Sequence, residues 1–246
     1  MKFSCISSFL ILILVPAVVM SEPDVSDKKI TILRAGDWAP YHYVENNQLK
    51  GNLIQLIRKA SEISGIEAEF KTVPNWNRCL RLMKLGMVDA FFPIFKNDER
   101  ETYMIFHENG ILDYEKDYIV TSSTQKIDFS GDLKALKDYR IGVTKGYFYG
   151  KAFENADYLQ KIPSRNEEKL LDLLFADNRY DMIIGDRKVI TSIVSKKNKL
   201  DKIRFLEPPV VNEPLYMAFN KKIKAVRLKR FTDAIVKARQ RLKKNK

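Results

Sequence analysis

One pattern of apolar and polar residues occurs twice in this chain, about half its length apart. The first copy is LRLMKLGMVDAFFPIF at residues 80–95, and the second is KLLDLLFADNRYDMIIGD at residues 169–186. Each copy begins with apolar residues at helical spacing and ends, after a polar turn and an aspartate, in a short apolar run. This order is typical of a helix followed by a buried strand. The repeat therefore predicts two similar α/β units, with Asp89 and Asp181 in matching positions.

The two units differ in the charge that accompanies the predicted strand. A cation, Arg100, follows the first apolar run, whereas the second run ends on an anion, Asp186. Ligands bind at the carboxyl ends of strands in open α/β sheets. We therefore expect two lobes that close on one ligand carrying both charges.

The rest of the chain continues the alternation of strands and helices. Residues 29–35 (KITILRA) alternate between apolar and polar types and are rich in β-branched residues, which predicts a strand. In residues 52–64 the apolar positions recur at helical spacing, with Asn52 as the expected N-cap and Gly65 as the expected stop. The same patterns predict strands at 68–73, 90–95, 139–143, 203–206 and 216–220, an extended segment at 111–120, and helices at 76–85 and 223–242.

The segment PPVVNEP at residues 208–214 predicts a rigid connector that crosses between the two units. The chain then passes from lobe 1 to lobe 2 and back to lobe 1, which leaves two crossing segments as a hinge. We assign residues 22–112 and 212–246 to lobe 1, and residues 113–211 to lobe 2.

The first 21 residues predict a secretory signal peptide. One lysine is followed by an uncharged apolar stretch, and small residues around Ser21 suit cleavage there. The alternative is a transmembrane anchor, but the apolar core at residues 9–20 is shorter than the roughly 20 residues that a membrane span needs. Cleavage after Ser21 would leave the mature chain in the periplasm.

Cysteine and charge narrow the compartment and the partners. Cys79 is the single cysteine after residue 21, so no intramolecular disulfide can form. This fits a bacterial periplasm and a fold large enough to be stable without one. The chain has 43 Lys and Arg against 31 Asp and Glu, a net charge of +12. Such a charge often indicates nucleic-acid binding, but export argues against that partner and favours a solvated face or one near an anionic membrane.

Five segments occur in the order typical of one bacterial family. They are DWAP with the turn before Gly51, LGMVDA, DERETYMIF, IGVTKGYFYG and DNRYDMIIGD. Together they resemble the periplasmic solute-binding proteins of the polar-amino-acid type, family 3 of the ABC-transporter substrate-binding proteins. The resemblance implies a type II periplasmic-binding-protein fold, in which each lobe is a mixed α/β sheet flanked by helices. It also implies a monomer that holds one small molecule, without a cofactor or metal, for an inner-membrane ABC permease or a receptor.

The resemblance also implies which residues contact the ligand. Arg100 holds the place of an arginine that grips the ligand's carboxylate, a task that suits a planar guanidinium. Asp186 matches an aspartate that binds the ligand's α-ammonium, with capping of a helix as its alternative role. The other expected ligand-binding residues are aromatic side chains, for which core packing is the alternative, and a glycine loop whose N–H groups meet the carboxylate, namely Trp38, Tyr43, Trp76, Gly146, Tyr147 and Phe148.

This chain departs from the family pattern at several positions. Pro93, Ile94 and Phe148 stand where relatives often carry hydroxyls, and Gln55 stands where an aspartate is common. We therefore expect a site that is more aromatic and poorer in hydroxyl donors than that of a typical amino-acid binder.

These features predict capture of a small zwitterionic or anionic molecule, such as an amino acid, without catalysis. The sequence has no G-x-S-x-G, H-E-x-x-H or C-x-x-C motif, and its two histidines, His42 and His107, are too few for most metal sites. Two alternatives stay open. One is a dehydratase-like periplasmic enzyme on the same fold, which needs a further general acid or base in the cleft. The other is a solitary ligand sensor without a transporter.

Overall fold

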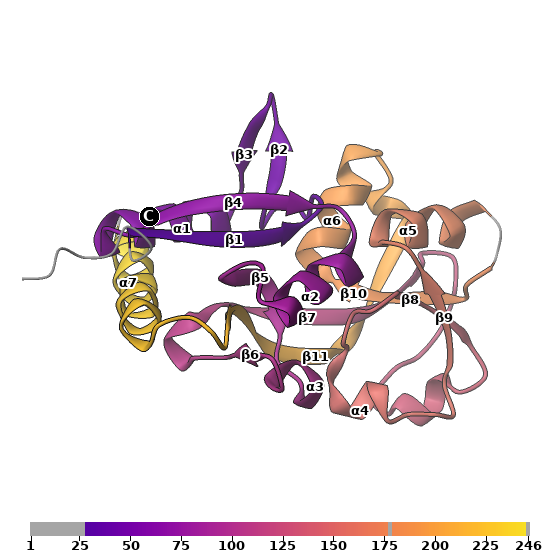
Figure 1. Cartoon of the computed structure of the whole chain (residues 1–246). Coiled ribbons are helices and arrows are strands. Elements are labelled where there is room, and N and C mark those ends of the chain that lie inside the picture. The colour runs from indigo at the N-terminus through magenta and orange to yellow at the C-terminus, as the bar shows by residue number, and fades with distance from the viewer. Residues whose placement is uncertain (1–27, 177–178, 245–246) are drawn as a thin grey trace, which may run out of the picture.

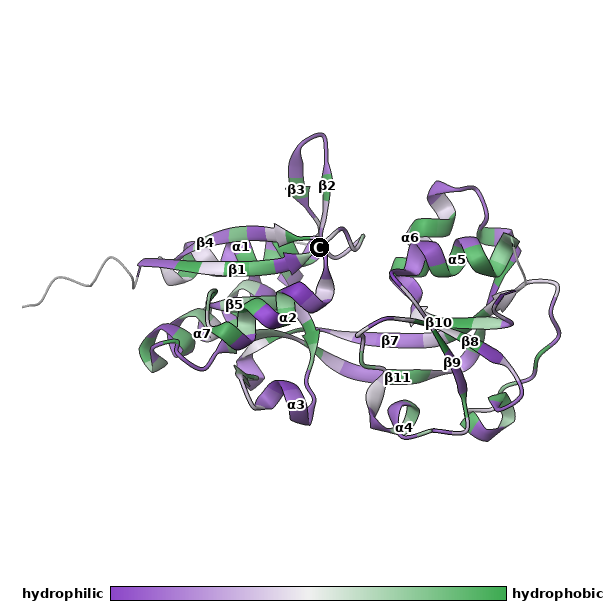
Figure 2. Ribbon diagram, turned by 45° about the vertical axis from the view of Figure 1, so that its right-hand side comes forward, coloured by the Kyte–Doolittle hydropathy of each residue, from purple (hydrophilic) through white to green (hydrophobic). Residues whose placement is uncertain are grey.

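The computed structural model describes residues 28–176 and 179–244 and consists of two α/β lobes side by side (Figure 1). Two long strands, β7 (Ile111–Ser122) and β11 (Ile203–Asn220), run from one lobe into the other (Figure 2). The predicted two-lobed α/β architecture is thus confirmed. The predicted signal peptide, residues 1–21, lies outside the described residues. Within the described residues, no helix is long and apolar enough to cross a membrane.

Lobe 1 is formed by the first and last parts of the chain. Its elements are β1 (Lys29–Ala35), β2 (Tyr43–Glu45), β3 (Gln48–Lys50), α1 (Asn52–Ser64), β4 (Glu67–Val73), α2 (Trp76–Leu85), β5 (Ala90–Phe95), α3 (Asp98–Glu101), β6 (Met104–Ile105), the 3-10 helix η2 (Glu108–Gly110) and α7 (Ala225–Lys244). Strand β1 pairs in parallel with β4 on one side and β5 on the other. All six residues of β5 are buried, which explains its uninterrupted apolar sequence.

Lobe 2 repeats this α/β arrangement with fewer residues. Its elements are η3 (Leu133–Leu136), β8 (Arg140–Thr144), α4 (Gly150–Glu154), β9 (Gln160–Ser164), α5 (Glu167–Ala176), β10 (Met182–Asp186), α6 (Arg187–Lys196) and η4 (Leu200–Lys202). Strand β8 lies between β9 and β10 and is parallel to both. The predicted helix–strand repeat is therefore present, as α2 with β5 in lobe 1 and α5 with β10 in lobe 2.

The two lobes share one continuous sheet. Its strand order is β4-β1-β5-β11-β7-β10-β8-β9, with β6 paired to β11 at the side. The prediction of two separate strands at 203–206 and 216–220 is wrong, because β11 is continuous across the segment between them. Its pairing with β7 changes register between Leu206 and Val211, around Pro208. A proline has no N–H for the ladder, so it is tolerated where the register shifts.

Most predicted boundaries in lobe 1 are confirmed. Helices α1 and α2 and strand β5 begin and end at the predicted residues. Gly65 ends α1 in the left-handed conformation with φ 64°, as expected of a glycine stop. The prediction of Asn52 as the N-cap is wrong by one position. Gly51 is the N-cap, and Asn52 is the first helical residue.

The two aspartates in matching positions of the repeat make matching contacts. Asp89 accepts a hydrogen bond of 2.8 Å from the Thr31 N–H in β1 and pairs with Arg227 at 3.1 Å. Asp181 accepts a hydrogen bond of 2.7 Å from the Arg140 N–H in β8 and pairs with the Arg140 guanidinium at 2.8 Å. Each carboxylate thus bonds the backbone of the neighbouring parallel strand near its start. The two copies of the repeat therefore share these backbone contacts as well as their sequence pattern.

Replacing Asp181 with alanine is expected to lower the free energy of unfolding by about 1–2 kcal/mol at neutral pH, because the Arg140 N–H loses its acceptor. The Arg140 hydrogen bond lowers the pKa of Asp181, so this stability is present above the ordinary carboxyl pKa and is lost as the pH falls below it. Urea unfolding at pH 7 and pH 3 measures the difference. Asp128→Ala, at an exposed aspartate, is the control and should leave the midpoint unchanged.

Candidate functional site

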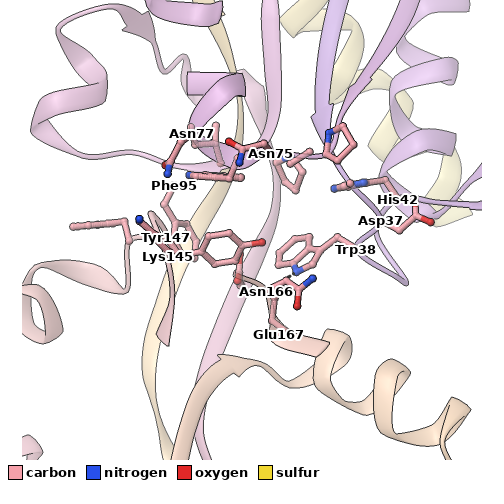
Figure 3. A pocket seen from close by; sticks show the side chains of 18 of the residues that line it. Asp37, Trp38, His42, Asn75, Asn77, Phe95, Lys145, Tyr147, Asn166 and Glu167 are labelled. Carbon is pink, nitrogen blue, oxygen red and sulfur yellow. Dashed lines mark hydrogen bonds between the residues drawn. The ribbon is translucent and has the colours of Figure 1, made fainter. Parts of the chain in front are cut away.

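A cavity of about 530 Å³ lies between the two lobes (Figure 3). Lobe 1 contributes the carboxyl ends of β1 and β5 and the start of α2, lobe 2 contributes the loop after β8 and the start of α5, and β7 crosses between them. The polar lining residues are Asp37, His42, Asn75, Asn77, Arg100, Glu115, Asp117, Lys145, Arg165, Asn166 and Glu167. The aromatic lining residues are Trp38, Trp76, Phe95, Tyr147 and Phe148.

The two helices of the repeat both begin at this cavity. Asn75 is the N-cap of α2 and accepts a hydrogen bond of 2.9 Å from the Arg78 N–H. Asn166 precedes α5 and accepts the equivalent bond, also 2.9 Å, from the Lys169 N–H. A helix N-terminus carries a partial positive charge. Each lobe therefore presents one such terminus to the space between the lobes, which favours a ligand with a negative group.

An aromatic wall joins the lobes on one side of the cavity. The rings of Trp76 in α2 and Tyr147 in the loop after β8 have centroids 4.9 Å apart. Trp76 also packs against Phe91 at 5.0 Å, which anchors it to the core of lobe 1. Tyr147 extends from lobe 2 across the cavity toward Trp38 (Figure 3).

The opposite wall is built around Trp38. Its ring stacks on that of Tyr41 with a centroid distance of 4.6 Å. Its indole Nε1–H donates a hydrogen bond of 2.9 Å to Glu167 in lobe 2. Flat apolar faces on both sides of a cavity suit the carbon skeleton of a small solute.

Arg100 is a buried cation at the lobe 1 edge of the cavity. Asn97 caps the short helix α3 by accepting a hydrogen bond of 2.8 Å from the Arg100 N–H, which fixes the position of the residue. The guanidinium donates to the Phe95 carbonyl oxygen at 2.7 Å and, across the lobes, to the Gly146 carbonyl oxygen at 3.3 Å. It also lies over the Trp76 ring at 5.6 Å. Since a guanidinium has five N–H donors, it can bind an anion as well.

Burial lowers the pKa of Arg100 to about 10, so the side chain is still charged at neutral pH. Only 3% of the residue is exposed. A buried charge is costly unless it is paired, and the partners above are neutral carbonyl groups. The cavity therefore offers a desolvated positive charge to a carboxylate.

Three buried carboxyl groups also line the cavity, in addition to the exposed Asp37. Glu115 and Asp117 lie in β7 and are 5% and 2% exposed, and Glu167 in the first turn of α5 is 7% exposed. Burial and the negative charge of Asp186 raise the pKa of Asp117 to about 8. Burial and the charge of Asp117 raise the pKa of Glu115. Glu115 and Asp117 therefore hold at least one proton between them at neutral pH.

His42 lines the cavity but does not add a charge. Burial and the neighbouring Arg34 guanidinium lower its pKa to about 3. Its Nδ1 lies 3.5 Å from Arg34 Nη1, and its ring packs edge-on against Phe92 at 5.4 Å. His42 is thus a neutral packing residue at physiological pH.

Five of the predicted ligand-binding residues come together in the cavity, namely Trp38, Trp76, Arg100, Tyr147 and Phe148. Tyr43 lies at the start of the β2–β3 hairpin, where Lys196 Nζ is 5.8 Å from its ring centroid, and it is not among the lining residues. Gly146 is not among the lining residues, but its carbonyl oxygen accepts the hydrogen bond from Arg100. The Tyr147 N–H in the same loop donates to the Thr144 carbonyl oxygen at 3.1 Å.

Asp186 is not among the lining residues either. It is the N-cap of α6, where it accepts a hydrogen bond of 2.9 Å from the Val189 N–H. The Tyr41 hydroxyl, from lobe 1, donates to its other oxygen at 3.1 Å. This contact agrees with the capping role that the sequence left open. The buried carboxyls that line the cavity are instead those of Glu115, Asp117 and Glu167.

Sequence reasoning missed the acidic pair and the asparagine caps. The signal for the pair is an acid at two alternate positions of an extended segment, since residues two apart in a strand face the same side. The signal for the caps is an asparagine directly before each helix of the repeat, at Asn75 and Asn166. The asparagines lie just before the 80–95 and 169–186 copies, whereas the acidic pair lies between the two copies, in a segment that the repeat does not include.

The ligand-free protein is expected to lose stability as the pH rises from about 4 to about 8. The pKa of Asp117 is raised from 3.8 to about 8 in the folded state, so the folded state binds the proton more tightly. This contribution is complete below the lower pKa and is lost as the pH rises through the higher one.

Thermal unfolding as a function of pH measures this loss. In Asp117→Asn, the drop in melting temperature between about pH 4 and about pH 8 should be smaller than in the wild type by at least about 2–4 °C. This difference is the equivalent of about 1 kcal/mol in a chain of this length. Asp128→Asn, at an exposed position, should keep the slope of the wild type. An unchanged slope in Asp117→Asn would contradict the raised pKa.

No group of three or more His, Cys, Asp or Glu residues in the described ranges is arranged to hold a metal ion. The features that line or face the cavity are a buried guanidinium, two helix N-termini, aromatic walls and an acidic pair.

Comparison with solved structures shows the same fold at low sequence identity. An ancestral arginine-binding protein bound to arginine has a TM-score of 0.72 and 18% identity, covering 87% of this chain and 93% of that one. A histidine kinase sensor domain with similarity to periplasmic binding proteins has a TM-score of 0.73 and 18% identity, covering 88% and 92%. A substrate-binding protein of an amino acid ABC transporter from Streptococcus pneumoniae, bound to L-arginine, has a TM-score of 0.68 and 19% identity, covering 89% and 91%.

A search of curated protein sequences found no match. The family model described as "Bacterial extracellular solute-binding proteins, family 3" matches residues 30–245, which is nearly the whole described chain. The match agrees with the two lobes and with the cavity between them. The chain belongs to the bacterial extracellular solute-binding proteins, family 3.

Proposed function

We propose that this protein captures a small zwitterionic or anionic solute of the amino-acid type between its two lobes. The observation that carries the proposal is Arg100, a charged guanidinium that is 3% exposed and lines the interlobe cavity beside the Trp76 ring. Membership of a solute-binding family and the arginine-bound structural neighbours support it. Arg100 binds the carboxylate, and the N-terminus of α2 adds to the positive potential there.

The aromatic walls hold the apolar part of the solute. Trp38 and Trp76 lie on the two sides of the cavity, with Tyr147 and Phe148 contributed by lobe 2. A solute between them excludes water from the buried charges, which strengthens the ion pair with Arg100. Because Trp38 and Trp76 belong to lobe 1 whereas Tyr147 and Phe148 belong to lobe 2, a bound solute contacts residues of both lobes only when the lobes are close together.

Closure follows from this difference in contact. The lobes are bridged by the Trp38–Glu167 bond, by the Tyr41–Asp186 bond and by an ion pair of 3.1 Å between Lys151 and Asp98. A solute that adds contacts to both lobes shifts the population toward the closed state. Strands β7 and β11 serve as the hinge, which fits lobe boundaries at residues 22–112 with 212–246 and 113–211.

We propose that the protein acts in the periplasm as a monomer and delivers the solute to an inner-membrane ABC permease. Two findings support this role. The family consists of extracellular solute-binding proteins, and two structural neighbours are substrate-binding proteins of amino acid ABC transporters. The predicted signal peptide, with cleavage after Ser21, accounts for export. We propose binding without catalysis because the family to which the chain belongs is one of solute-binding proteins.

A solitary sensor is the second candidate, because one neighbour with the same fold is a histidine kinase sensor domain. The two candidates share the binding site and differ in the partner. Uptake of radiolabelled solute by cells with and without this protein separates them. Uptake that depends on the protein supports delivery to a permease, whereas unchanged uptake supports the sensor.

A thermal-shift panel of the twenty common L-amino acids tests the proposed function. We expect at least one amino acid to raise the melting temperature in a saturable way, as binding to the folded state alone must. Mass spectrometry of small molecules released from the purified protein by denaturation is the independent arm. A panel without any stabilising amino acid, together with a released molecule that lacks a carboxylate, would rule out the proposal.

A further inference from the structure

Strand β7 forms one side of the cavity, called here its floor, and it carries two carboxyl groups that have no cationic partner. Glu115 and Asp117 both line the cavity and are 5% and 2% exposed. Within the described part of the chain, neither forms an ion pair with a lysine, arginine or histidine. A buried carboxylate without a partner is costly. A ligand group that supplies the missing positive charge would remove that cost.

The groups around the pair add negative charge rather than positive. Asp186 in β10 lies directly opposite Asp117 in the antiparallel pairing with β7, and like charges in opposite positions repel. The negative charge of Glu167 in α5 also raises the pKa of both carboxyls. The tyrosines near the cluster are neutral, because burial and the surrounding carboxylates raise their pKa values; they are Tyr41, Tyr147 and Tyr149.

Three of the cations near the pair make other contacts, whereas Lys145 and Arg165 of lobe 2 line the cavity as exposed side chains. Lys188 in α6 pairs with Asp113 at 3.0 Å, on the outer part of β7. Arg187, at the start of the same helix, pairs with Glu207 at 2.5 Å and lies over the rings of Tyr118 and Phe205, 3.9 and 4.8 Å from their centroids. Arg100 donates to carbonyl oxygens at the edge of the cavity. The cavity thus has a positive edge at Arg100 and a negative floor at β7.

We propose that Glu115 and Asp117 receive the primary ammonium group of the solute, while Arg100 receives its carboxylate. This inference rests on the proposed function and places the ammonium site on a strand that crosses between the lobes. It differs from the role that the resemblance implied for Asp186, which caps α6 and bonds Tyr41. The ammonium replaces the proton that the pair holds without ligand, and that proton passes to the solvent.

A site on the crossing strand also connects binding with closure. Strand β7 pairs with β11 in lobe 1 and with β10 in lobe 2. Neutralising its buried carboxyls relieves repulsion at the position where the strand leaves one lobe for the other. The ammonium therefore stabilises the hinge itself as well as the contact between the walls.

Calorimetry with an amino acid and its des-amino analogue tests the inference. The probe is the L-amino acid that gives the largest thermal shift in the panel, and the analogue is the same molecule with hydrogen in place of the ammonium. Asp117→Asn and Glu115→Gln should each weaken binding of the amino acid at least tenfold and leave the analogue unchanged or tighter. Wild-type binding should release a proton, seen as a heat that depends on the buffer, and Asp117→Asn should release less.

Asp113→Asn is the matched control, because Asp113 is an acid on the same strand that pairs with Lys188 and does not line the cavity. It should keep the wild-type affinity for both probes. Equal losses for the two probes, or no loss in either acid variant, would overturn the ammonium site while leaving the proposed function intact. If no amino acid in the panel binds and the molecule released from the protein lacks a carboxylate, the proposed function fails and the ammonium site fails with it.

Discussion

Replacing Arg100 with alanine should weaken binding of the carboxylate-bearing solute at least about 30-fold, the equivalent of roughly 2 kcal/mol. The guanidinium is the charged donor at the lobe 1 edge of the cavity, and it is desolvated by burial. Removing it leaves the ligand's carboxylate among aromatic rings and carbonyl oxygens at that edge, without its buried ionic partner. Isothermal titration calorimetry with the amino acid selected by the thermal-shift panel measures the loss.

Two further variants separate charge from geometry and from stability. Arg100→Lys keeps the charge but loses the planar fork, so it should bind more weakly than the wild type and more tightly than Arg100→Ala. Arg78→Ala, an exposed arginine in the first turn of α2 that does not line the cavity, should bind normally. Wild-type affinity in Arg100→Ala, at an unchanged melting temperature, would show that the carboxylate is held elsewhere.

Replacing Gly51 with alanine should lower the free energy of unfolding by more than about 4 kcal/mol. Effects this large arise when a substitution causes both backbone strain and atomic overlap in the interior. Gly51 is the N-cap of α1 and has φ 123°, a conformation that side-chain-bearing residues rarely adopt. A Cβ there would overlap the Tyr41 carbonyl oxygen and approach the His42 nitrogen to 2.8 Å. The same carbonyl accepts a hydrogen bond of 3.1 Å from the Leu53 N–H, so it cannot move freely.

Gly36 provides the control for this effect. A Cβ at Gly36 has the Pro74 carbonyl oxygen as its nearest neighbour, at 3.9 Å, which is ordinary contact. Urea unfolding of Gly36→Ala should therefore give a midpoint near that of the wild type. If Gly51→Ala unfolds at the same urea concentration as Gly36→Ala, the close approach of the Trp38–His42 loop to α1 is not present.

The helices and strands of lobe 1 could be predicted because their signals are local. Helical periodicity defines α1 and α2, and the apolar run AFFPIF defines β5 as a strand buried on both faces. The repeat also predicted the second helix–strand unit. By contrast, the continuity of β11 depends on its pairing with β7, a contact between segments far apart in the chain.

The candidate site was predictable only in part, for the same reason. Arg100, Trp38 and Trp76 follow strand ends or begin a helix, so their position next to a cleft follows from topology. Whether Asp186 faces the cavity or caps α6 depends on the partners that folding brings to it, here the Val189 N–H and the Tyr41 hydroxyl. Glu115 and Asp117 are candidate ligand-binding residues because they are buried in the cavity between the lobes. No local sequence pattern predicts that burial.

The emission of the two tryptophans tests the central claim most directly. Trp38 and Trp76 are the tryptophans of the whole sequence, and both line the cavity between the lobes. If the solute is captured there, titration should change the emission in a saturable way, with the same dissociation constant as calorimetry. Trp38→Phe and Trp76→Phe should each retain part of the change. Calorimetric binding without any change in tryptophan emission would contradict capture of the solute in this cavity.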